Sequence, residues 1–314
     1  MRIGEFACLD LVLGVTEQGE ALRFRRSVVE PAAANLPRHL EAEASAILNG
    51  LLKEGERRAE WTYDHDDGTI FRVRRIPSRR GVWYVLRKIA GDLPALDDLG
   101  IDMNLLRSLI ALGRGSGLMT IGAPPGHGKS TLASVLLVEM VKAYARTAYA
   151  VEDPPEYPVE GFHQGPYGDG QVLQLHPDQY GGWREAINAT LRGTGNILFL
   201  GEVRTPEVAY LALELGLSNF VMCTIHAGSI GETLTRFAAL ASERAGETVP
   251  AGMMLADTLK AALHLRMQTR PSVAGQASRM SPVVKHLFPD KTDRHHMREN
   301  QFHLVVPQTD RHQV

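Results

Sequence analysis

Between residues 106 and 227, short apolar runs alternate with longer stretches in which apolar residues recur at helical spacing. The apolar runs are "GLMTIG", "TAYAVED", "NILFLGE" and "FVMCTIHA". The stretches between them predict helices over roughly 131–145, 183–192 and 206–217. Because buried strands that alternate with helices form parallel sheets covered on both faces, this region predicts an α/β domain.

The first part of the chain follows a different pattern. "DLVLGVTEQGEALRF" alternates apolar and polar residues around a glycine-containing turn and predicts two strands. "LPRHLEAEASAILNGLLKEG", residues 36–55, has helical spacing and ends at a glycine. Residues 60–89 contain β-rich runs separated by a D-G turn and a Pro-Ser-Arg-Arg-Gly turn, which predict three more strands. This part therefore reads as a small α+β domain.

The change of pattern near "AGDLPALDDLGID" predicts the domain organisation. We expect an N-terminal α+β domain over 1–95, a linker over 96–105, a second domain over 106–280 and a tail over 281–314. In the last part of the chain, "AGMMLADTLKAALHLRMQTR" predicts a helix, and the polar, His-rich tail holds one strand candidate, "FHLVV".

The composition is that of an ordinary globular protein, with 44% apolar and 22% charged residues. The net charge of −2 lacks the basic excess of a dedicated nucleic-acid binder, so no direct nucleic-acid partner is expected. Cys8 and Cys223 follow no metal or disulfide spacing and suggest a reducing compartment. We expect no signal peptide, and no apolar run approaches the roughly 18 residues of a membrane span, so membrane association would be peripheral.

The stretch "GAPPGHGKSTLASVLL", residues 122–137, joins an apolar run to a predicted helix. The backbone N–H groups of a glycine-rich turn approach phosphate oxygens closely, and the helix N-terminus adds a partial positive charge. Lys129 is expected to reach the β- and γ-phosphates, and the Ser130 hydroxyl to bind Mg²⁺. We therefore predict ATP and Mg²⁺ as cofactors. The predicted binding residues are Gly122, Pro125, Gly126, His127, Gly128, Lys129, Ser130 and Thr131.

A second motif is "ILFLGE", residues 197–202. In P-loop enzymes an apolar strand beside the P-loop strand ends in an acidic residue, which holds Mg²⁺ water or polarises the attacking water. The usual last pair is Asp-Glu, whereas this chain has Gly201 and Glu202. Glu202 is therefore expected to fill the catalytic and metal-binding role alone.

Four blocks appear in order along the chain: "GAPPGHGKST", "AVEDPPEY", "ILFLGEVRTPE" and "CTIHAGSIGETLTR". They resemble the Walker A, Asp box, Walker B and His box of the type II/type IV secretion and pilus-motor ATPases. "FRVRRIPSRRGVWYVLRKI" followed by "LPALDDLGI" resembles the end of that family's PAS-like domain and its linker. The resemblance covers roughly residues 60–270. It implies a RecA-like P-loop NTPase core, a parallel sheet flanked by helices, with a small N-terminal PAS-like α+β domain.

The resemblance also implies roles for residues outside the P-loop. Glu152, expected to end a strand next to the P-loop strand, would help to position Mg²⁺ and water, partly through water-mediated contacts. Glu156 is a weaker member of the same box. His226, at the end of the fourth strand, would hydrogen-bond the γ-phosphate and report its loss.

Arginines matter because phosphoryl transfer spreads negative charge over the γ-phosphate oxygens. In the family's hexamers, the N-terminal domain of one subunit packs on the motor domain of the next. Arg72 and Arg87 match positions where the family carries arginines that face the nucleotide. Arg204 and Arg192, on either side of "ILFLGE", are candidates for conformational coupling.

The resemblance implies a homo-hexameric ATPase motor of a type II/type IV secretion, conjugation or type IV pilus system. Such a motor would be cytoplasmic and peripheral to the inner membrane, with platform or secretion-channel proteins as partners. The chain lacks a four-cysteine insertion and recognisable retraction-type C-terminal helices, which favours the conjugation or Dot/Icm-like type IVb branch.

Two alternatives stay open at the level of sequence. A RecA-like nucleic-acid translocase would share the core, but the chain lacks a basic excess and an evident aromatic stacking platform. A non-enzymatic assembly protein with a degenerate nucleotide site would be consistent with two departures from the expected patterns. Ala123 stands at the first glycine of the P-loop pattern, and Asn188 replaces an arginine that the family usually carries.

Overall fold

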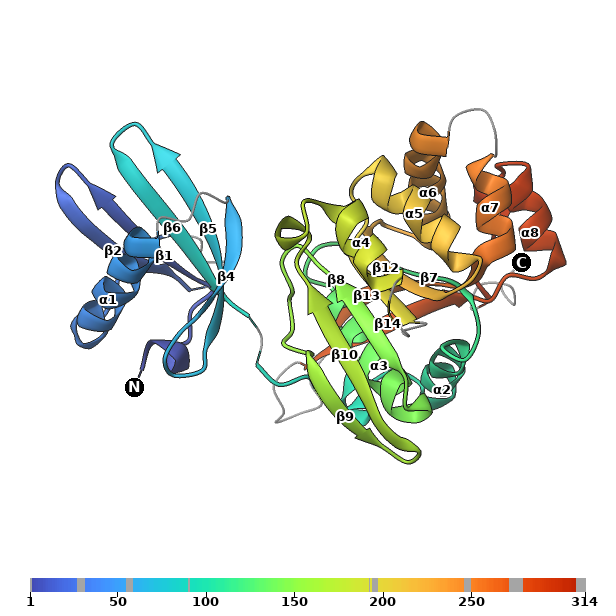
Figure 1. Cartoon of the computed structure of the whole chain (residues 1–314), viewed down its shortest axis with the longest axis horizontal. Helices are drawn as coiled ribbons and strands as arrows, with labels where there is room; N and C mark the ends of the chain where they lie inside the picture. Colours follow the sequence, from blue (N-terminus) through green and yellow to red (C-terminus); the bar gives the residue numbers. More distant parts are fainter. Residues whose placement is uncertain are drawn as a thin grey trace. The chain divides into compact units, whose positions relative to one another are not determined.

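The structure is a computed structural model that describes residues 2–26, 32–54, 59–89, 91–191, 193, 197–245, 250–270 and 279–308. The chain divides into two compact units, Met1–Asp92 and Leu93–Val314 (Figure 1). Among the described residues, no helix combines the length and the apolar character that crossing a bilayer requires.

The first unit is an antiparallel sheet with one long helix. Its strands are β1 (Asp10–Thr16), β2 (Gly19–Arg25), β3 (Ala34–Asn35), β4 (Glu60–Asp64), β5 (Ile70–Ser78) and β6 (Gly81–Lys88). The sheet order is β3-β2-β1-β6-β5-β4. A 3-10 helix, η1 (Ile3–Glu5), precedes the sheet, and α1 (Arg38–Glu54) supplies Leu40, Ile47 and Leu48 to a core shared with one face of it. The predicted helix and strands are therefore present in this unit.

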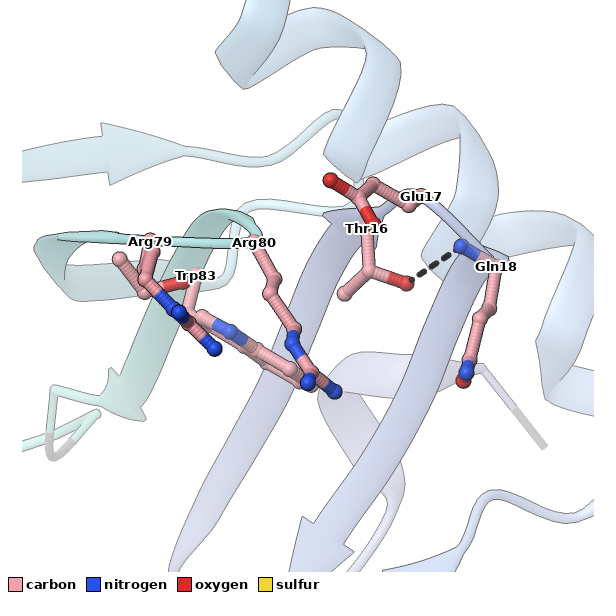
Figure 2. Close-up of a pocket in the computed structure, with 7 residues that line it drawn as sticks. Thr16, Glu17, Gln18, Arg79, Arg80 and Trp83 are labelled. Atoms are coloured by element: carbon pink, nitrogen blue, oxygen red, sulfur yellow. Dashed lines mark hydrogen bonds between the residues drawn. The ribbon is translucent and has the colours of Figure 1, made fainter.

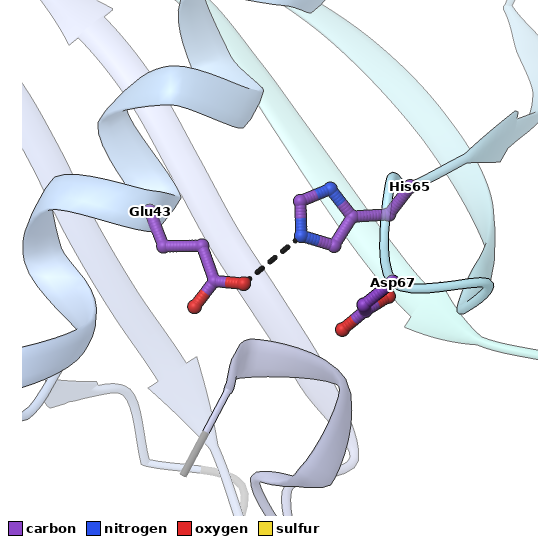
Figure 3. A group of neighbouring side chains, drawn as sticks. All are labelled: Glu43, His65 and Asp67. Atoms are coloured by element: carbon purple, nitrogen blue, oxygen red, sulfur yellow. Dashed lines mark hydrogen bonds and ion pairs between the residues drawn. The ribbon is translucent and has the colours of Figure 1, made fainter.

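Glu43 of α1 is joined to the turn between β4 and β5, as Figure 3 shows. Its carboxylate lies 3.0 Å from His65 Nε2 and accepts a hydrogen bond of 3.0 Å from the Ile3 backbone N–H. Asp67, in the same turn, accepts a 2.9 Å hydrogen bond from the Thr69 backbone N–H. Because both carboxylates are already hydrogen-bonded within the unit, these residues tie the helix, the turn and η1 together.

A shallow pocket lies between the turns of two hairpins, β1–β2 and β5–β6 (Figure 2). Trp83 of β6 packs across Gly14 of β1, where a Cβ would lie 2.5 Å from the indole. The side chains of Arg79 and Arg80 lie beside the indole. The glycine at position 14 thus makes room for the tryptophan on the sheet face.

The second unit contains an eight-stranded sheet with the order β14-β13-β7-β12-β11-β8-β10-β9. Its strands are β7 (Gly117–Ala123), β8 (Thr147–Val151), β9 (Gly161–Gly165), β10 (Gly168–Leu175), β11 (Ile197–Glu202), β12 (Phe220–His226), β13 (Leu259–Arg270) and β14 (Arg279–Leu287). Neighbours pair in parallel from β13 to β10, and the two edge strands, β14 and β9, are antiparallel.

Helices cover both faces of this sheet (Figure 1). The helices are α2 (Met103–Leu112), α3 (Lys129–Tyr144), α4 (Trp183–Leu191), α5 (Pro206–Gly216), α6 (Ile230–Ala245), α7 (Ala251–Thr258) and α8 (Lys291–Arg298). Along β7, Met119 and Ile121 pack with α2 and α3, whereas Leu118 belongs to the core formed with α4 to α8. The predicted α/β fold, a mainly parallel sheet flanked by helices, is confirmed.

The order of strands differs from the sequence-based expectation. The P-loop strand β7 lies between β13 and β12, so β11 is its second neighbour on the β12 side and β8 its third. The expectations that Glu202 and Glu152 end strands beside the P-loop strand are therefore wrong. The local sequence does not show which position in the sheet a strand takes after the helix that precedes it. Because β7, β12, β11 and β8 are parallel, their carboxyl ends still meet at one edge of the sheet.

The predicted helix over "AGMMLADTLKAALHLRMQTR" is only partly correct. Helix α7 ends at Thr258, and Leu259–Arg270 forms β13 in parallel with β7. Leu259 and Ala262 pack into one core and Ala261 and Leu263 into the other, so the segment is buried on both faces of the sheet. This tertiary burial outweighs the helical propensity of its alanines and leucines.

The expected linker and tail also belong to the second unit. In the 96–105 segment, η2 (Leu96–Leu99) and the residues after it pack against the α2–α3 core. In the 281–314 segment, β14 pairs with β13, and α8 packs on α7. "FHLVV" forms the 3-10 helix η4 (Phe302–Leu304) instead of a strand. Another short 3-10 helix, η3 (Pro177–Gln179), follows β10.

Candidate nucleotide-binding and catalytic site

The P-loop connects β7 to α3 at the carboxyl edge of the sheet. Gly126 and Gly128 have φ values of 74° and 85°, a left-handed conformation that favours glycine. Gly128 is the N-cap of α3, and no described side chain caps this helix end. His127 stabilises the loop through an Nδ1 contact of 2.9 Å to the carbonyl oxygen of exposed Pro125. The first N–H groups of the helix are thus free of side-chain caps, as an anion site requires.

Lys129 is buried, with 7% of its surface exposed. Its Nζ lies 3.3 Å from the Ala123 carbonyl oxygen and 2.9 Å from His226 Nδ1. Burial lowers the pKa of Lys129, and the charge of Glu202 opposes this shift. Because β12 pairs with β7 so that His226 is opposite Ala123, the histidine reaches the lysine directly.

His226 also contacts the predicted catalytic glutamate. Its Nε2 lies 2.8 Å from Glu202 Oε1, and Arg204 Nη2 lies 2.5 Å from Glu202 Oε2. A charged lysine can only donate, so Nδ1 of His226 accepts from Lys129 and Nε2 carries the proton donated to Glu202. The side chains of Lys129, His226, Glu202 and Arg204 therefore form a continuous hydrogen-bonded line.

A bulge in β11 sets the position of Glu202. The pairing of β11 with β12 shifts between Leu200 and Glu202. The Thr224 hydroxyl donates to the Gly201 carbonyl oxygen at 2.7 Å, and the Val203 N–H donates to the Thr224 carbonyl oxygen at 2.8 Å. The bulge is thus fixed from β12, the strand that also carries His226.

Glu152 follows β8 and is 4% exposed. Burial raises the pKa of its carboxyl to about 7, while a hydrogen bond from Gln174 opposes the shift and the charge of Glu156 adds to it. A Cβ at Gly201 would lie 3.1 Å from Glu152 Cγ. The glycine of the Gly-Glu pair therefore leaves space for a second carboxylate, which an aspartate at position 201 would crowd.

Three residues that the sequence analysis did not assign support this arrangement. The Tyr157 hydroxyl lies 2.8 Å from Thr131 Oγ1, and Gln174 Nε2 donates to Glu152 Oε1 at 3.0 Å. Arg236 of α6 donates to the His226 carbonyl oxygen. Tyr157 and Arg236 lie inside recognised motifs and could have been found there. Gln174 lies in "QVLQL", which gives no local signal of its role.

The residues present fit ATP with Mg²⁺. The open start of α3 and the buried Lys129 suit phosphate oxygens. Ser130, Glu152 and Glu202 offer the oxygen ligands that Mg²⁺ prefers. Gly122 borders α6 closely, because a Cβ there would lie 2.2 Å from Thr233 Oγ1.

The predicted arginines of the N-terminal region lie in the first unit. Arg72 Nη2 is 2.6 Å from Glu60 Oε2, and Arg87 Nε is 2.8 Å from Asp10 Oδ1. Their contact with a nucleotide in a neighbouring subunit stays a prediction. Arg192 lies outside the described residues.

A P-loop, an acidic strand end and a histidine on one parallel sheet define a P-loop protein with a RecA-like core. The chain belongs to the family described as "Type II/IV secretion system protein", whose family model matches residues 62–301, more than half of the 314 residues.

Named relatives agree with this membership. The chain is 27% identical over 198 residues to the type IV pilus assembly ATPase PilB of Thermus thermophilus, a match that covers 60% of this chain and 21% of that protein. The chain spans between about a fifth and about a third of the length of the first curated relatives it matches.

Solved structures share the fold. A crystal structure of the pilus retraction motor PilT with bound ADP matches with a TM-score of 0.73 at 20% identity, covering 97% of this chain and 88% of PilT. The ATPase DotB of Legionella pneumophila matches with a TM-score of 0.68 at 18% identity, covering 96% of this chain and 85% of DotB. At these identities the likeness shows the fold alone.

Proposed function

We propose that this chain hydrolyses MgATP as a subunit of a homo-hexameric motor that serves a secretion, conjugation or type IV pilus system. The observation that carries the proposal is the hydrogen-bonded line from Lys129 through His226 to Glu202 at the end of a P-loop. Membership in the secretion family and the names of the relatives support the choice of machine.

Each residue of the site has a role that its contacts support. Bound MgATP supplies the reactive γ-phosphoryl group and a cation that neutralises its charge. Lys129 and the start of α3 hold the phosphates, and Ser130 holds the cation. Glu202 orients the attacking water and accepts its proton, with Glu152 assisting. Since His226 contacts both Lys129 and Glu202, it is placed to respond when a phosphate takes over Lys129.

Hydrolysis would move the N-terminal units against the motor units through contacts that differ between the ATP and ADP states. Arg204 is a coupling candidate, because its partner Glu202 acts on the nucleotide. The motion would be passed to inner-membrane platform or channel proteins, with the hexamer peripheral to the cytoplasmic side of that membrane.

Light scattering with and without ATP, together with a phosphate-release assay, tests the proposal. We expect a hexamer whose turnover falls at least about a hundredfold in Glu202→Gln and disappears in Lys129→Ala. Wild-type hydrolysis no higher than that of Lys129→Ala, with the membrane partner present, would reject the motor. Retained ATP binding in that case would identify an assembly protein with a degenerate site.

A further inference from the structure

Gln174 makes four hydrogen bonds with the loop that follows β8. It lies on β10, where its position pairs in parallel with Ala150 of β8. Its Nε2 donates to Glu152 Oε1 at 3.0 Å and to the Tyr157 carbonyl oxygen at 2.9 Å. Its Oε1 accepts from the backbone N–H groups of Val159 at 3.0 Å and Glu160 at 3.1 Å.

These contacts use the whole hydrogen-bonding capacity of a primary amide, which has two N–H donors and two acceptor lone pairs. They also fix the orientation of the amide, because the flipped group would place N–H groups against the N–H groups of Val159 and Glu160. No other side chain supplies the same set at this length. A glutamate lacks the two donors, a leucine lacks all four functions, and an asparagine is one methylene shorter.

The loop held by Gln174 also reaches the P-loop. Tyr157, whose carbonyl oxygen accepts from Gln174, places its hydroxyl 2.8 Å from Thr131 Oγ1 in the first turn of α3. The Glu152 backbone N–H donates at 3.1 Å to the carbonyl oxygen of Leu175, the residue after Gln174. A strand outside the four motif-bearing strands thus fixes both the Glu152 carboxylate and the loop that contacts the P-loop helix.

We propose that Gln174 is a positioning residue, which sets the Glu152 carboxylate for hydrolysis and holds loop 152–160 against the P-loop helix. The inference rests on the proposed function. Gln174 does not touch the nucleotide in this proposal but acts through Glu152 and Tyr157. Its loss should therefore lower kcat for ATP hydrolysis and leave KM for ATP nearly unchanged.

The first experiment compares Gln174→Leu with Gln171→Leu, a control on the same strand three residues earlier. In Gln174→Leu we expect kcat to fall about tenfold or more, with KM for ATP within about threefold of wild type. The control should keep both constants. A rise in KM at unchanged kcat would overturn the proposal, because it would place Gln174 in ground-state binding.

A double-mutant comparison tests whether Gln174 acts through Glu152. In a Glu152→Ala background, Gln174→Leu should lower kcat by a smaller factor than in wild type, because the carboxylate that it positions is already gone and only its contacts with Tyr157, Val159 and Glu160 are lost. A full, independent loss in that background would contradict the proposal. If wild-type protein hydrolyses no ATP, the proposed function fails. The hydrogen bonds from Gln174 to loop 152–160 are still tested by the following measurement.

Hydrogen exchange followed by mass spectrometry tests the hydrogen bonds from Gln174 to loop 152–160 and does not depend on ATP hydrolysis. The Glu160 amide should exchange at least about tenfold faster in Gln174→Leu than in Gln171→Leu. The Val159 amide should change less, because it also donates to the Tyr157 carbonyl oxygen at 3.0 Å. An unchanged exchange rate of these amides in Gln174→Leu would contradict the proposal that Gln174 holds loop 152–160.

Discussion

At the scale of single residues, Gly122 shows how tightly the P-loop strand is packed against the helix behind it. A Cβ at this position would lie 2.2 Å from Oγ1 of Thr233, which is fully buried. We predict that Gly122→Ala lowers the free energy of unfolding by about 1–3 kcal/mol through overpacking. Thr233→Ala should restore part of that loss in the double variant, since the Thr233 Cβ would be 3.4 Å away. Urea unfolding measures both.

Gly115→Ala is the matched control for this prediction, because nothing lies within 4 Å of a Cβ there. Its stability should stay within about 0.5 kcal/mol of wild type. A Gly122→Ala variant as stable as Gly115→Ala would contradict the close packing of β7 on α6.

Cys8 is a second residue whose surroundings predict a measurable property. Burial, with a further contribution from the charge of Asp10, raises the pKa of its thiol to about 11. The folded state therefore favours the neutral thiol. The fraction of Cys8 present as the reactive thiolate rises about tenfold per pH unit until about pH 11. We predict that iodoacetamide labels Cys8 at pH 8 about a hundredfold more slowly in the folded protein than in urea.

In the folded protein, Cys8→Ser assigns the labelling to that thiol, since Cys223 is completely buried there. Mass spectrometry of the labelled peptide gives the rate. A labelling rate in the folded protein equal to the rate in urea would show that the thiol is accessible and that its pKa is not raised.

The site residues separate into those that sequence could indicate and those that it could not. The P-loop pattern indicates Lys129 because phosphate binding imposes a local spacing on the chain. Glu202 and His226 end apolar runs, and the structure places the two side chains in contact. Gln174 gives no such signal, because its partners lie between 14 and 22 residues away and come together only when β10 pairs with β8.

At the scale of elements, the β9–β10 hairpin lies directly on the last turns of α3. A Cβ at Gly165 would lie 2.0 Å from the Lys142 carbonyl oxygen, and one at Gly170 would lie 2.2 Å from the Val141 carbonyl oxygen. Backbone atoms cannot rotate away as a side chain can. We predict that Gly170→Ala lowers the free energy of unfolding by about 2 kcal/mol or more.

Gly165→Ala should behave similarly, whereas Gly115→Ala again serves as the neutral control. Thermal unfolding of the three variants measures the difference. Equal melting temperatures for Gly170→Ala and Gly115→Ala would mean that the hairpin can lift from α3 at little cost.

The predicted elements succeeded where the local pattern and the final environment agree. The apolar run before the P-loop forms β7, which is buried throughout. The same reasoning failed for residues 259–270, because alanine and leucine are good helix formers. These residues form a strand only because they pair with β7 in the sheet. The β9–β10 hairpin was missed as well, since glycine-rich strands lack the apolar alternation that identifies a strand.

At the scale of the whole molecule, the proposed hexamer predicts that an N-terminal arginine of one subunit completes the nucleotide site of the next. Arg72 is the better residue for a test, because Glu60 keeps Arg74 at 3.3 Å when Arg72 is removed. Removing Arg87 would instead deprive Asp10, which is 2% exposed, of its ion-pair partner and risk the fold.

We therefore predict that Glu202→Gln and Arg72→Ala subunits, each nearly inactive alone, regain ATPase activity when they are co-expressed with different tags and purified as mixed rings. In a ring of head-to-tail interfaces, about a quarter of randomly formed interfaces join an intact Glu202 site to an intact Arg72. Activity should therefore return to a similar fraction of wild type. Mixed rings no more active than the average of the two parents would show that Arg72 acts within its own chain or only in folding. Recovery would place a charge from the first unit at a neighbour's nucleotide, so that hydrolysis in one subunit depends on the position of the next.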